Sequence, residues 1–400
     1  MPVPLAIGLV WWLGFSGLGL IFPFYALYLR ENAGLAGSEL GLVLAVQPLV
    51  GMFGQLLWGQ ISDRTGQRAR VLTAIALGSC VGHLVLLQAG SFAGFLAGTG
   101  VLALFSTSFT PSCFAVTAAV MPDGAGFGRA RAMGTISFGV SALALPFALR
   151  WIQVAGLGAP PARAEGEPGL ELIFAAAAMF YVLTALASGL LPRDGDVSAR
   201  AASGQWRELL RSRDFLRVVG FTLLAFLAMQ GPTIMLPVLV RDHGGGIDAI
   251  SRLWLLMVSL EIPLVYYFGA TVRRLGGRTV ITLGLLAGVV RWGISGFADD
   301  PAWVYGSQVL HGVTVWGVIV GTSFYVNQVV PPELRSTAQA ALATFGTGLG
   351  ALLSNVGAGV LIDVVGARGP ARAAAVITAL LAVMIPLLVP RPRADAPLPA

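Results

Sequence analysis

The chain of 400 residues is too apolar to fold as a water-soluble globule, because 56% of its residues are hydrophobic and only 11% are charged, where a soluble domain carries about 25%. Its formal net charge of +6 comes entirely from arginine, since the sequence contains no lysine. This balance favours a membrane protein whose basic loops meet anionic lipid headgroups over a nucleic-acid-binding protein, and the absence of lysine excludes a Walker-type ATPase.

Twelve hydrophobic stretches of the sequence approach or exceed the length of about 20 residues that a helix needs to cross a bilayer. The breaks between them carry charge or turn-forming residues, as at Asp123-Gly124 and Asp299-Asp300-Pro301. We therefore expect an all-α membrane protein with twelve transmembrane helices. The predicted spans are 4–29, 39–59, 70–89, 92–120, 131–153, 170–191, 215–240, 249–272, 278–297, 301–329, 336–362 and 371–390.

A short charged turn bounded by glycines occurs twice, at 59–68 and at 269–278, with an offset of 210 residues. A repeat at half the chain length, between membrane-length runs, indicates two pseudo-symmetric halves of six helices each. We expect this turn to act as a conformational latch at the cytoplasmic surface, with Asp63 capping or pairing with a helix end. Arg273 replaces the aspartate in the second copy, so the latch should be weaker there. The predicted latch residues are Gly59, Asp63, Arg64, Gly66, Arg68, Arg274, Gly276 and Arg278.

The two halves also match in the position of a proline. Ile21-Phe22-Pro23-Phe24 in the first span resembles Met235-Leu236-Pro237-Val238 in the seventh. Proline removes a backbone donor and loosens the helix around it, so both spans are expected to bend at this point.

The predicted domains are an N-terminal six-helix bundle (1–191), a cytoplasmic linker (192–214), a C-terminal six-helix bundle (215–390) and a disordered tail (391–400). Apolar residues alternate with arginines at helical spacing in the linker, which predicts an amphipathic helix on the membrane surface; a disordered basic linker is the alternative. If both termini are cytoplasmic, the inner loops and tail hold seventeen of the 25 arginines and the outer loops hold seven. The positive-inside rule therefore places both termini in the cytoplasm.

Three ionisable residues lie well inside the predicted spans of the second half: Glu261, Arg291 and His311. A charge in mid-bilayer costs about 2.5–3.5 kcal/mol on insertion scales, so such a residue must pair, face water or do work. Glu261 and Arg291 are about 12 and 13 residues from the inner ends of adjacent antiparallel spans, which is about 18–20 Å. We expect all three to form a polar cluster facing a central cavity, with Gln308 and Thr314 on the His311 face. A buried Glu–Arg pair that only fixes helix packing is the alternative.

The chemistry of this cluster suits proton and solute binding. Glutamate and histidine can exchange a proton near neutral pH when their surroundings shift them, and Arg291 can alternate between Glu261 and an anionic or hydroxyl-bearing solute. Three dispersed histidines and two lone cysteines supply neither a metal site nor a catalytic constellation. We therefore expect no enzyme activity, no cofactor and no metal.

These residues resemble the major facilitator superfamily over essentially the whole chain. The hallmark Gly-x-x-x-Asp-Arg-x-Gly-x-Arg stands at 59–68, and a degenerate second copy is usual in that superfamily. Within it, Phe22-Pro23-Phe24 and Leu310-His311-Gly312 are similar to the proton symporters for oligosaccharides, nucleosides and phenylpropionate. The resemblance implies two six-helix bundles, a central site and alternating access. It also implies that Glu261, Arg291 and His311 belong to the coupling and substrate network. Arg131 and the aromatic Phe138 stand where lactose permease has a sugar-contacting arginine and a tryptophan.

Two departures from lactose permease limit this resemblance. Cys113 and Thr314 stand where that protein has an essential glutamate and a proton-carrying glutamate. Galactoside transport is therefore not expected, and the proton carrier is Glu261 or His311, or is absent.

We expect a secondary active transporter of a small organic solute in a bacterial-type inner membrane, monomeric, working by alternating access and coupled to proton symport. Proton-driven efflux of drugs or sugars is the alternative within this class. A non-transporting membrane protein, such as a solute sensor or an assembly factor, is the competing class.

Overall fold

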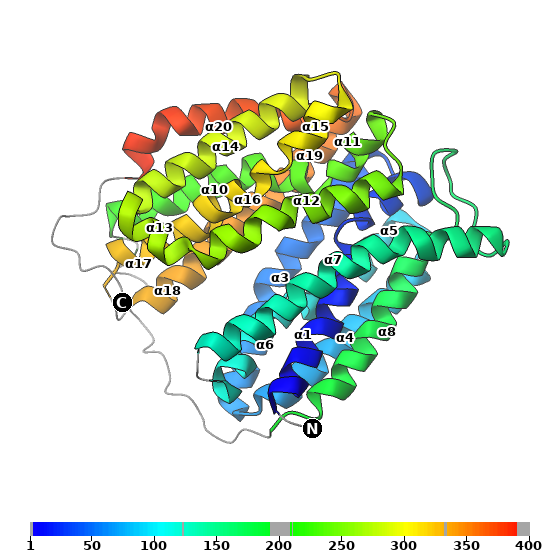
Figure 1. Cartoon of the computed structure of the whole chain (residues 1–400), viewed down its shortest axis with the longest axis horizontal. Helices are drawn as coiled ribbons and strands as arrows, with labels where there is room; N and C mark the ends of the chain where they lie inside the picture. Colours follow the sequence, from blue (N-terminus) through cyan, green and yellow to red (C-terminus); the bar gives the residue numbers. More distant parts are fainter. Residues whose placement is uncertain (1–2, 122–123, 193–208, 210, 332–333, 390–400) are drawn as a thin grey trace. The chain divides into compact units, whose positions relative to one another are not determined.

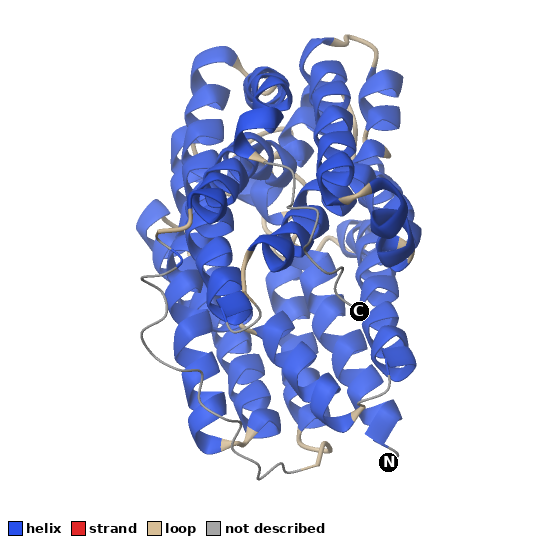
Figure 2. Cartoon of the chain, turned by 90° about the vertical axis from the view of Figure 1, so that its left-hand side faces the viewer, coloured by secondary structure: helices blue, strands red, loops and turns tan. Residues whose placement is uncertain are grey.

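The computed structural model describes residues 3–121, 124–192, 209, 211–331 and 334–389, and these residues form helices joined by loops, without a strand (Figure 2). The amphipathic linker predicted within 192–214 and the tail at 391–400 lie mainly or wholly outside the described residues. The all-α prediction is confirmed. In the described part of the chain, ten helices are long and apolar enough to cross a membrane, and Leu172–Ser188 is a shorter apolar helix.

The chain divides into two compact units, Met1–Arg200 and Ala201–Ala400. Figure 1 labels most of their α-helices. The first unit contains α1 (Val3–Ile21), α2 (Tyr25–Leu27), the π-helical segment η1 (Tyr28–Asn32), α3 (Gly37–Thr65), α4 (Arg68–Leu87), α5 (Phe92–Ser106), α6 (Phe109–Val120), α7 (Gly124–Val154) and α8 (Leu172–Ser188). The second unit contains α10 (Arg213–Ile234), α11 (Leu236–Asp242), α12 (Ile247–Tyr266), α13 (Phe268–Leu275), α14 (Gly277–Phe297), α15 (Pro301–Ser307), α16 (Leu310–Thr314), η2 (Val315–Val320), α17 (Gly321–Val329), α18 (Arg335–Ala341), η4 (Leu342–Gly348), α19 (Leu349–Val365) and α20 (Gly369–Leu388).

In the first unit, α1 packs on α7 and α8, while α4 packs on α5 and α8. Buried aromatic side chains fill the space between these helices, among them Trp11, Phe109 and Tyr181. The indole Nε1 of Trp11 donates a hydrogen bond of 2.8 Å to the hydroxyl of Thr117 on α6. This buried indole N–H is thus paired within an otherwise apolar core, as a bilayer-embedded structure favours.

In the second unit, α10 packs on α19 and α20, and α14 packs on α20 and on α16. α16 also packs on α12, so this short helix contacts both α12 and α14. The segment from 301 to 329 is not one regular helix: it turns at 308–309 and becomes π-helical over Val315–Val320. These irregular turns decide which side chains of the segment face α14.

Both predicted proline bends are present. α1 ends at Ile21 and α2 begins at Tyr25, so Pro23 lies in the turn between them. α10 ends at Ile234, and α11 begins at Leu236 with Pro237 in its first turn. The corresponding spans of the two units are therefore broken at corresponding points.

Most of each charged repeat is helical, because 59–65 belongs to α3 and 269–275 belongs to α13, and the chain turns only at the glycine that follows. Gly66 ends α3 with φ +65°, and its N–H donates 2.9 Å to the carbonyl of Ser62. Gly276 ends α13 with φ +78°, and its N–H donates 2.9 Å to the carbonyl of Val272. Only glycine takes positive φ without strain, which explains why a glycine stands at this position in both copies.

Candidate functional site

The second unit brings together Arg291, Gln308 and His311, three of the residues that the sequence singled out. Arg291 lies in the C-terminal half of α14, Gln308 in the turn after α15, and His311 in the first turn of α16. α15 and α16 both pack along α14. This packing brings Gln308 and His311 near Arg291, although they follow it by 17 and 20 positions in the chain.

Arg291 is buried, with a relative exposure of 1%. Its Nε donates a hydrogen bond of 2.8 Å to Oε1 of Gln308, and its guanidinium carbon lies 4.1 Å from the centroid of the Trp292 ring. Its Nη2 atom is buried without a hydrogen-bond partner. A buried guanidinium with an unused donor is costly in an apolar medium, so this atom is a candidate contact for a solute.

Gln308 is the neutral partner of Arg291 and has no exposed surface. Its Nε2 lies 2.9 Å from Oγ of Ser295, 3.0 Å from the carbonyl of Val304 and 3.1 Å from Oγ of Ser307. The amide nitrogen therefore faces three acceptors while the amide oxygen faces the arginine. Ser295 and Ser307 were not among the predicted site residues. The available signal was the i, i+4 spacing of Arg291 and Ser295, which puts both on one face of α14.

His311 is partly exposed, and its buried Nδ1 has no hydrogen-bond partner. The imidazole lies within electrostatic range of Arg291. The next residue, Gly312, packs directly on α12: a methyl group there would lie 2.6 Å from the backbone nitrogen of Glu261. The sequence predicted Glu261 and Arg291 on adjacent helices; in the structure, their helices are joined through α16, which carries His311.

Thr314 points into the helix interface. It is buried, and its hydroxyl donates 3.1 Å to the carbonyl of Leu310. A methyl group on Gly288 of α14 would lie 3.9 Å from the Thr314 hydroxyl oxygen and 3.8 Å from a methyl of Thr378 in α20. Thr314 thus packs against α14 at Gly288.

Phe138 belongs to the first unit, on α7. Its backbone packs against Gly19 of α1, where a methyl group would lie 2.9 Å from the Phe138 Cα. Arg131 lies about two turns before Phe138 on α7. Its guanidinium carbon is 5.2 Å from the ring centroid of Phe114. These contacts fix α7 against its neighbours within this unit.

The first copy of the charged turn borders a small pocket of about 110 Å³ between α3 and α6. Gly59, Asp63 and Arg68 line it, together with the hydroxyl groups of Ser62, Ser108 and Ser112. Arg64 is exposed, and Gly66 caps the helix. In the second copy, Arg274 is exposed and Arg278 is half-buried in the first turn of α14.

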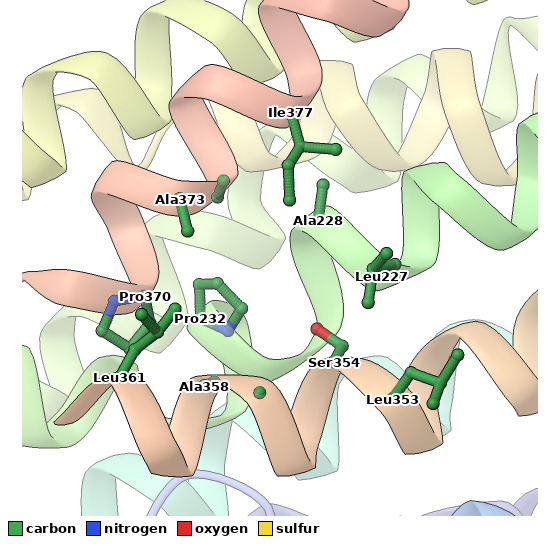
Figure 3. Close-up of a pocket in the computed structure, with 12 residues that line it drawn as sticks. Leu227, Ala228, Pro232, Leu353, Ser354, Ala358, Leu361, Pro370, Ala373 and Ile377 are labelled. Carbon is green, nitrogen blue, oxygen red and sulfur yellow. The ribbon is translucent and has the colours of Figure 1, made fainter. Parts of the chain in front are cut away.

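A second concavity of about 110 Å³ lies between α10, α19 and α20 (Figure 3). Its walls are formed by small and aliphatic side chains, including Pro232, Ala358 and Ile377. Ser354 supplies the hydroxyl in the wall, and its Oγ accepts a hydrogen bond of 2.7 Å from the backbone nitrogen of Gly231. This groove therefore offers shape and apolar contact but no group for proton or solute chemistry.

Within the described part of the chain, no three histidine, cysteine, aspartate or glutamate side chains gather closely enough to hold a metal ion. Cys80 and Cys113 are free and buried.

Known proteins similar to this chain are transporters. The maltose permease of Geobacillus stearothermophilus is 27% identical over 359 residues, covering 89% of this chain and 86% of the permease. A putative sugar efflux transporter of Deinococcus radiodurans is 27% identical over 380 residues, covering 92% and 93%. Among solved structures, a mutant of the nucleoside transporter NupG superimposes with a TM-score of 0.83 at 14% identity, covering 96% of this chain and 99% of that one. This likeness confirms the twelve-helix fold of the major facilitator superfamily.

Residues 5–370 match the MFS_1 like family. That range contains both copies of the charged turn and the whole Arg291–Gln308–His311 cluster. The chain is an integral membrane protein and a transporter, and it belongs to the MFS_1 like family of the major facilitator superfamily.

Proposed function

We propose that this protein is a secondary active transporter that carries a small hydroxylated solute of the sugar or nucleoside class by proton symport and alternating access. The names of its relatives support the solute class, because they include a maltose permease and a nucleoside transporter. The observation that carries the proposal is the pair of unpartnered atoms Arg291 Nη2 and His311 Nδ1. One hydroxyl group of a sugar or a ribose can accept a hydrogen bond from Arg291 Nη2, and another can donate one to an unprotonated His311 Nδ1.

Proton coupling is proposed to arise from Glu261 and His311. A proton on either group changes the charge near Arg291, so proton uptake and solute binding influence one another electrostatically. The packing of Gly312 on the Glu261 backbone supports this pairing, because it holds the two titratable residues on touching helices. Gln308 supports Arg291, Thr314 fixes the packing of α16, and Phe138 is proposed as an aromatic contact for the solute.

The charged turns are proposed to form the conformational latch, with Asp63 and Arg68 at the pocket between α3 and α6 as its polar groups. We further propose a monomer in the bacterial inner membrane with both termini cytoplasmic, in line with the arginine-rich inner loops. Lipid is then the solvent for its outer surface.

The test is uptake of radiolabelled maltose and radiolabelled uridine into proteoliposomes with and without an inwardly directed proton gradient. Wild-type protein should accumulate at least one of the two above equilibrium only when the gradient is present. Glu261→Gln or His311→Gln should abolish that accumulation while leaving downhill exchange, and Arg291→Lys should weaken both because lysine lacks the guanidinium fork. Asp214→Asn, an exposed carboxylate paired with Arg217, is the matched control. Undiminished gradient-driven uptake by Glu261→Gln would remove Glu261 from the coupling role.

Proton-driven efflux is the second candidate, and the name of the Deinococcus relative favours it. Cells that make the protein should then accumulate less of the labelled sugar than cells that lack it. Symport predicts the opposite difference, so the same pair of strains decides between the two directions.

A further inference from the structure

The Gln308 amide has one possible orientation in this structure. An amide NH₂ group has two donor hydrogens and no lone pair available for acceptance. It lies within 3.1 Å of three acceptors: the hydroxyl oxygens of Ser295 and Ser307 and the carbonyl of Val304. A reversed amide would place its oxygen against the Val304 carbonyl and turn its NH₂ group toward the Arg291 Nε–H. Both contacts would be repulsive, so the oxygen must face Arg291.

The two serine hydroxyls complete a directional set of hydrogen bonds. Ser307 donates 2.8 Å to the carbonyl of Val304, which leaves its lone pairs for the Gln308 amide. Ser295 lies 3.5 Å from Ser307, oxygen to oxygen, and accepts from the same amide. Ser295, Ser307 and Gln308 are all buried. A buried amide is removed from bulk solvent, so its orientation depends on these two hydroxyls and one carbonyl.

The orientation of Gln308 is transmitted to the arginine. Its Oε1 accepts from Nε of Arg291, and the guanidinium carbon lies 4.1 Å from the centroid of the Trp292 ring. A guanidinium is planar, so these two contacts restrict the orientation of the whole group. The terminal nitrogens of the guanidinium, including the unpartnered Nη2, then have a defined orientation. Because Gln308 is neutral, it holds Arg291 without cancelling its positive charge.

We propose that Ser295 and Ser307 are positioning residues, which orient Gln308 and through it hold the guanidinium of Arg291 ready for the solute. The link from Arg291 to solute rests on the function proposed above; the link from the serines to Arg291 does not. Neither serine contacts the unpartnered end of the guanidinium, so their influence on solute binding runs through Gln308.

The first measurement requires no solute. In purified protein with isotope-labelled arginine, the Nε–H signal of Arg291 is identified by its loss in Arg291→Lys, and its hydrogen exchange with water is followed by NMR. The double variant Ser295→Ala/Ser307→Ala should exchange about tenfold faster at this position, equivalent to about 1.4 kcal/mol of lost protection. Ser251→Ala is the control, because Ser251 is a buried serine of α12 that donates to the Ile247 carbonyl in its own helix. Exchange at Arg291 that is unchanged in the double variant overturns the proposal.

The second measurement separates positioning from a merely structural role. In the double variant, the KM for uptake of maltose or uridine should rise about tenfold, while the maximal rate and the melting temperature match those of Ser251→Ala. Ser295→Thr, which keeps the hydroxyl, should restore KM in part. A lower melting temperature with an unchanged KM contradicts the proposal. If the double variant does not fold, Ser307→Ala alone removes one of three acceptors and should show the same changes at smaller size.

Gln308→Glu provides an independent check. The carboxylate keeps an acceptor for Nε of Arg291 but cannot donate to the serines and neutralises the guanidinium charge. In Gln308→Glu, the Nε–H of Arg291 should still exchange slowly with water, while the KM for solute uptake should rise. Wild-type protein that transports neither maltose nor uridine contradicts the proposed solute class, and the exchange measurement then decides the positioning role by itself.

Discussion

Gly312 of α16 packs on the backbone of Glu261 in α12, so closely that a methyl group on Gly312 would lie 2.6 Å from the Glu261 nitrogen. This contact sets the distance between the helix that carries His311 and the helix that carries Glu261. The neighbouring backbone cannot move aside as a flexible side chain would, so the space is available only to glycine.

Gly312→Ala should therefore push α16 away from α12. We expect a loss of about 1–3 kcal/mol of stability, as for other overpacked sites, together with a loss of gradient-driven uptake. Gly306→Ala is the control, because nothing lies within 4 Å of a methyl group at that position. Thermal unfolding in detergent and uptake into proteoliposomes give the two readouts. Equal behaviour of the two variants would show that the contact does not matter.

The two glycines of the first charged turn should respond differently to substitution. Gly66 has φ +65°, and an alanine in this left-handed region costs about 1–2 kcal/mol. Gly59 is helical, and no atom lies within 4 Å of an added methyl group, although the residue borders the pocket with Asp63 and Arg68. Gly66→Ala should lower the melting temperature, whereas Gly59→Ala should keep it and reduce uptake if Gly59 belongs to the latch. Full uptake by Gly59→Ala would exclude Gly59 from that role.

The Trp11–Thr117 hydrogen bond should contribute measurably to the stability of the first unit. Thr117→Val keeps the shape of the side chain but leaves the buried indole N–H of Trp11 without its acceptor. We expect a loss of about 1–3 kcal/mol, the desolvation penalty of a buried unsatisfied donor. Thr184→Val is the matched control, because the buried Thr184 hydroxyl bonds only the Phe180 carbonyl of its own helix in the described structure. Equal shifts in melting temperature for the two variants would contradict this assignment.

The loop before α15 carries a pH-sensitive ion pair. The hydrogen bond and the charge of Arg368, 2.7 Å away, lower the pKa of Asp299 below its ordinary value of 3.8, and the same contact raises the pKa of Arg368. A carboxyl group whose pKa is lower in the folded state than in the unfolded state stabilises the folded protein at pH values above the unfolded-state pKa of that group. That contribution disappears as the pH falls through the lower folded value.

Asp299→Asn should therefore lower the melting temperature slightly at pH 7 and low salt, where the carboxylate is charged. The difference from wild type should shrink at high salt and vanish at strongly acidic pH, because Asp299 is exposed and its attraction is screened. A difference in melting temperature that grows as the pH falls would contradict a stabilising role of the Asp299 carboxylate. Melting curves at several pH values and two salt concentrations provide the measurement.

The fold could be predicted from the sequence because a bilayer imposes a length and a polarity on every span. Runs of apolar residues such as 70–89 and 278–297 correspond to α4 and α14 with few residues of error. The positive-φ glycines Gly66 and Gly276 were likewise visible as a repeat, since a turn of this kind depends on local backbone geometry. These features are local, so they need no knowledge of neighbouring helices.

The composition of the site could be predicted only in part. A charged residue within an apolar run, such as Arg291, stands out in the sequence because its burial is costly. Ser295 and Ser307 do not stand out, because a serine in a span is common and is usually satisfied by its own helix. Their contact with the Gln308 amide became evident only when α14 and α15 placed both hydroxyls beside it.

By itself, the sequence determined the approximate positions of the apolar spans, the two-fold repeat and the identity of the costly residues, since each depends on neighbours along the chain. The tertiary structure decided which of those residues meet. α16 contacts both α12, which carries Glu261, and α14, which carries Arg291. Irregular turns lie on either side of α16, and Gln308 faces Arg291 while Thr314 faces Gly288. The physical reason is that side-chain direction depends on rotation about the helix axis, which a single turn or a π-helical segment changes and which apolar length does not record.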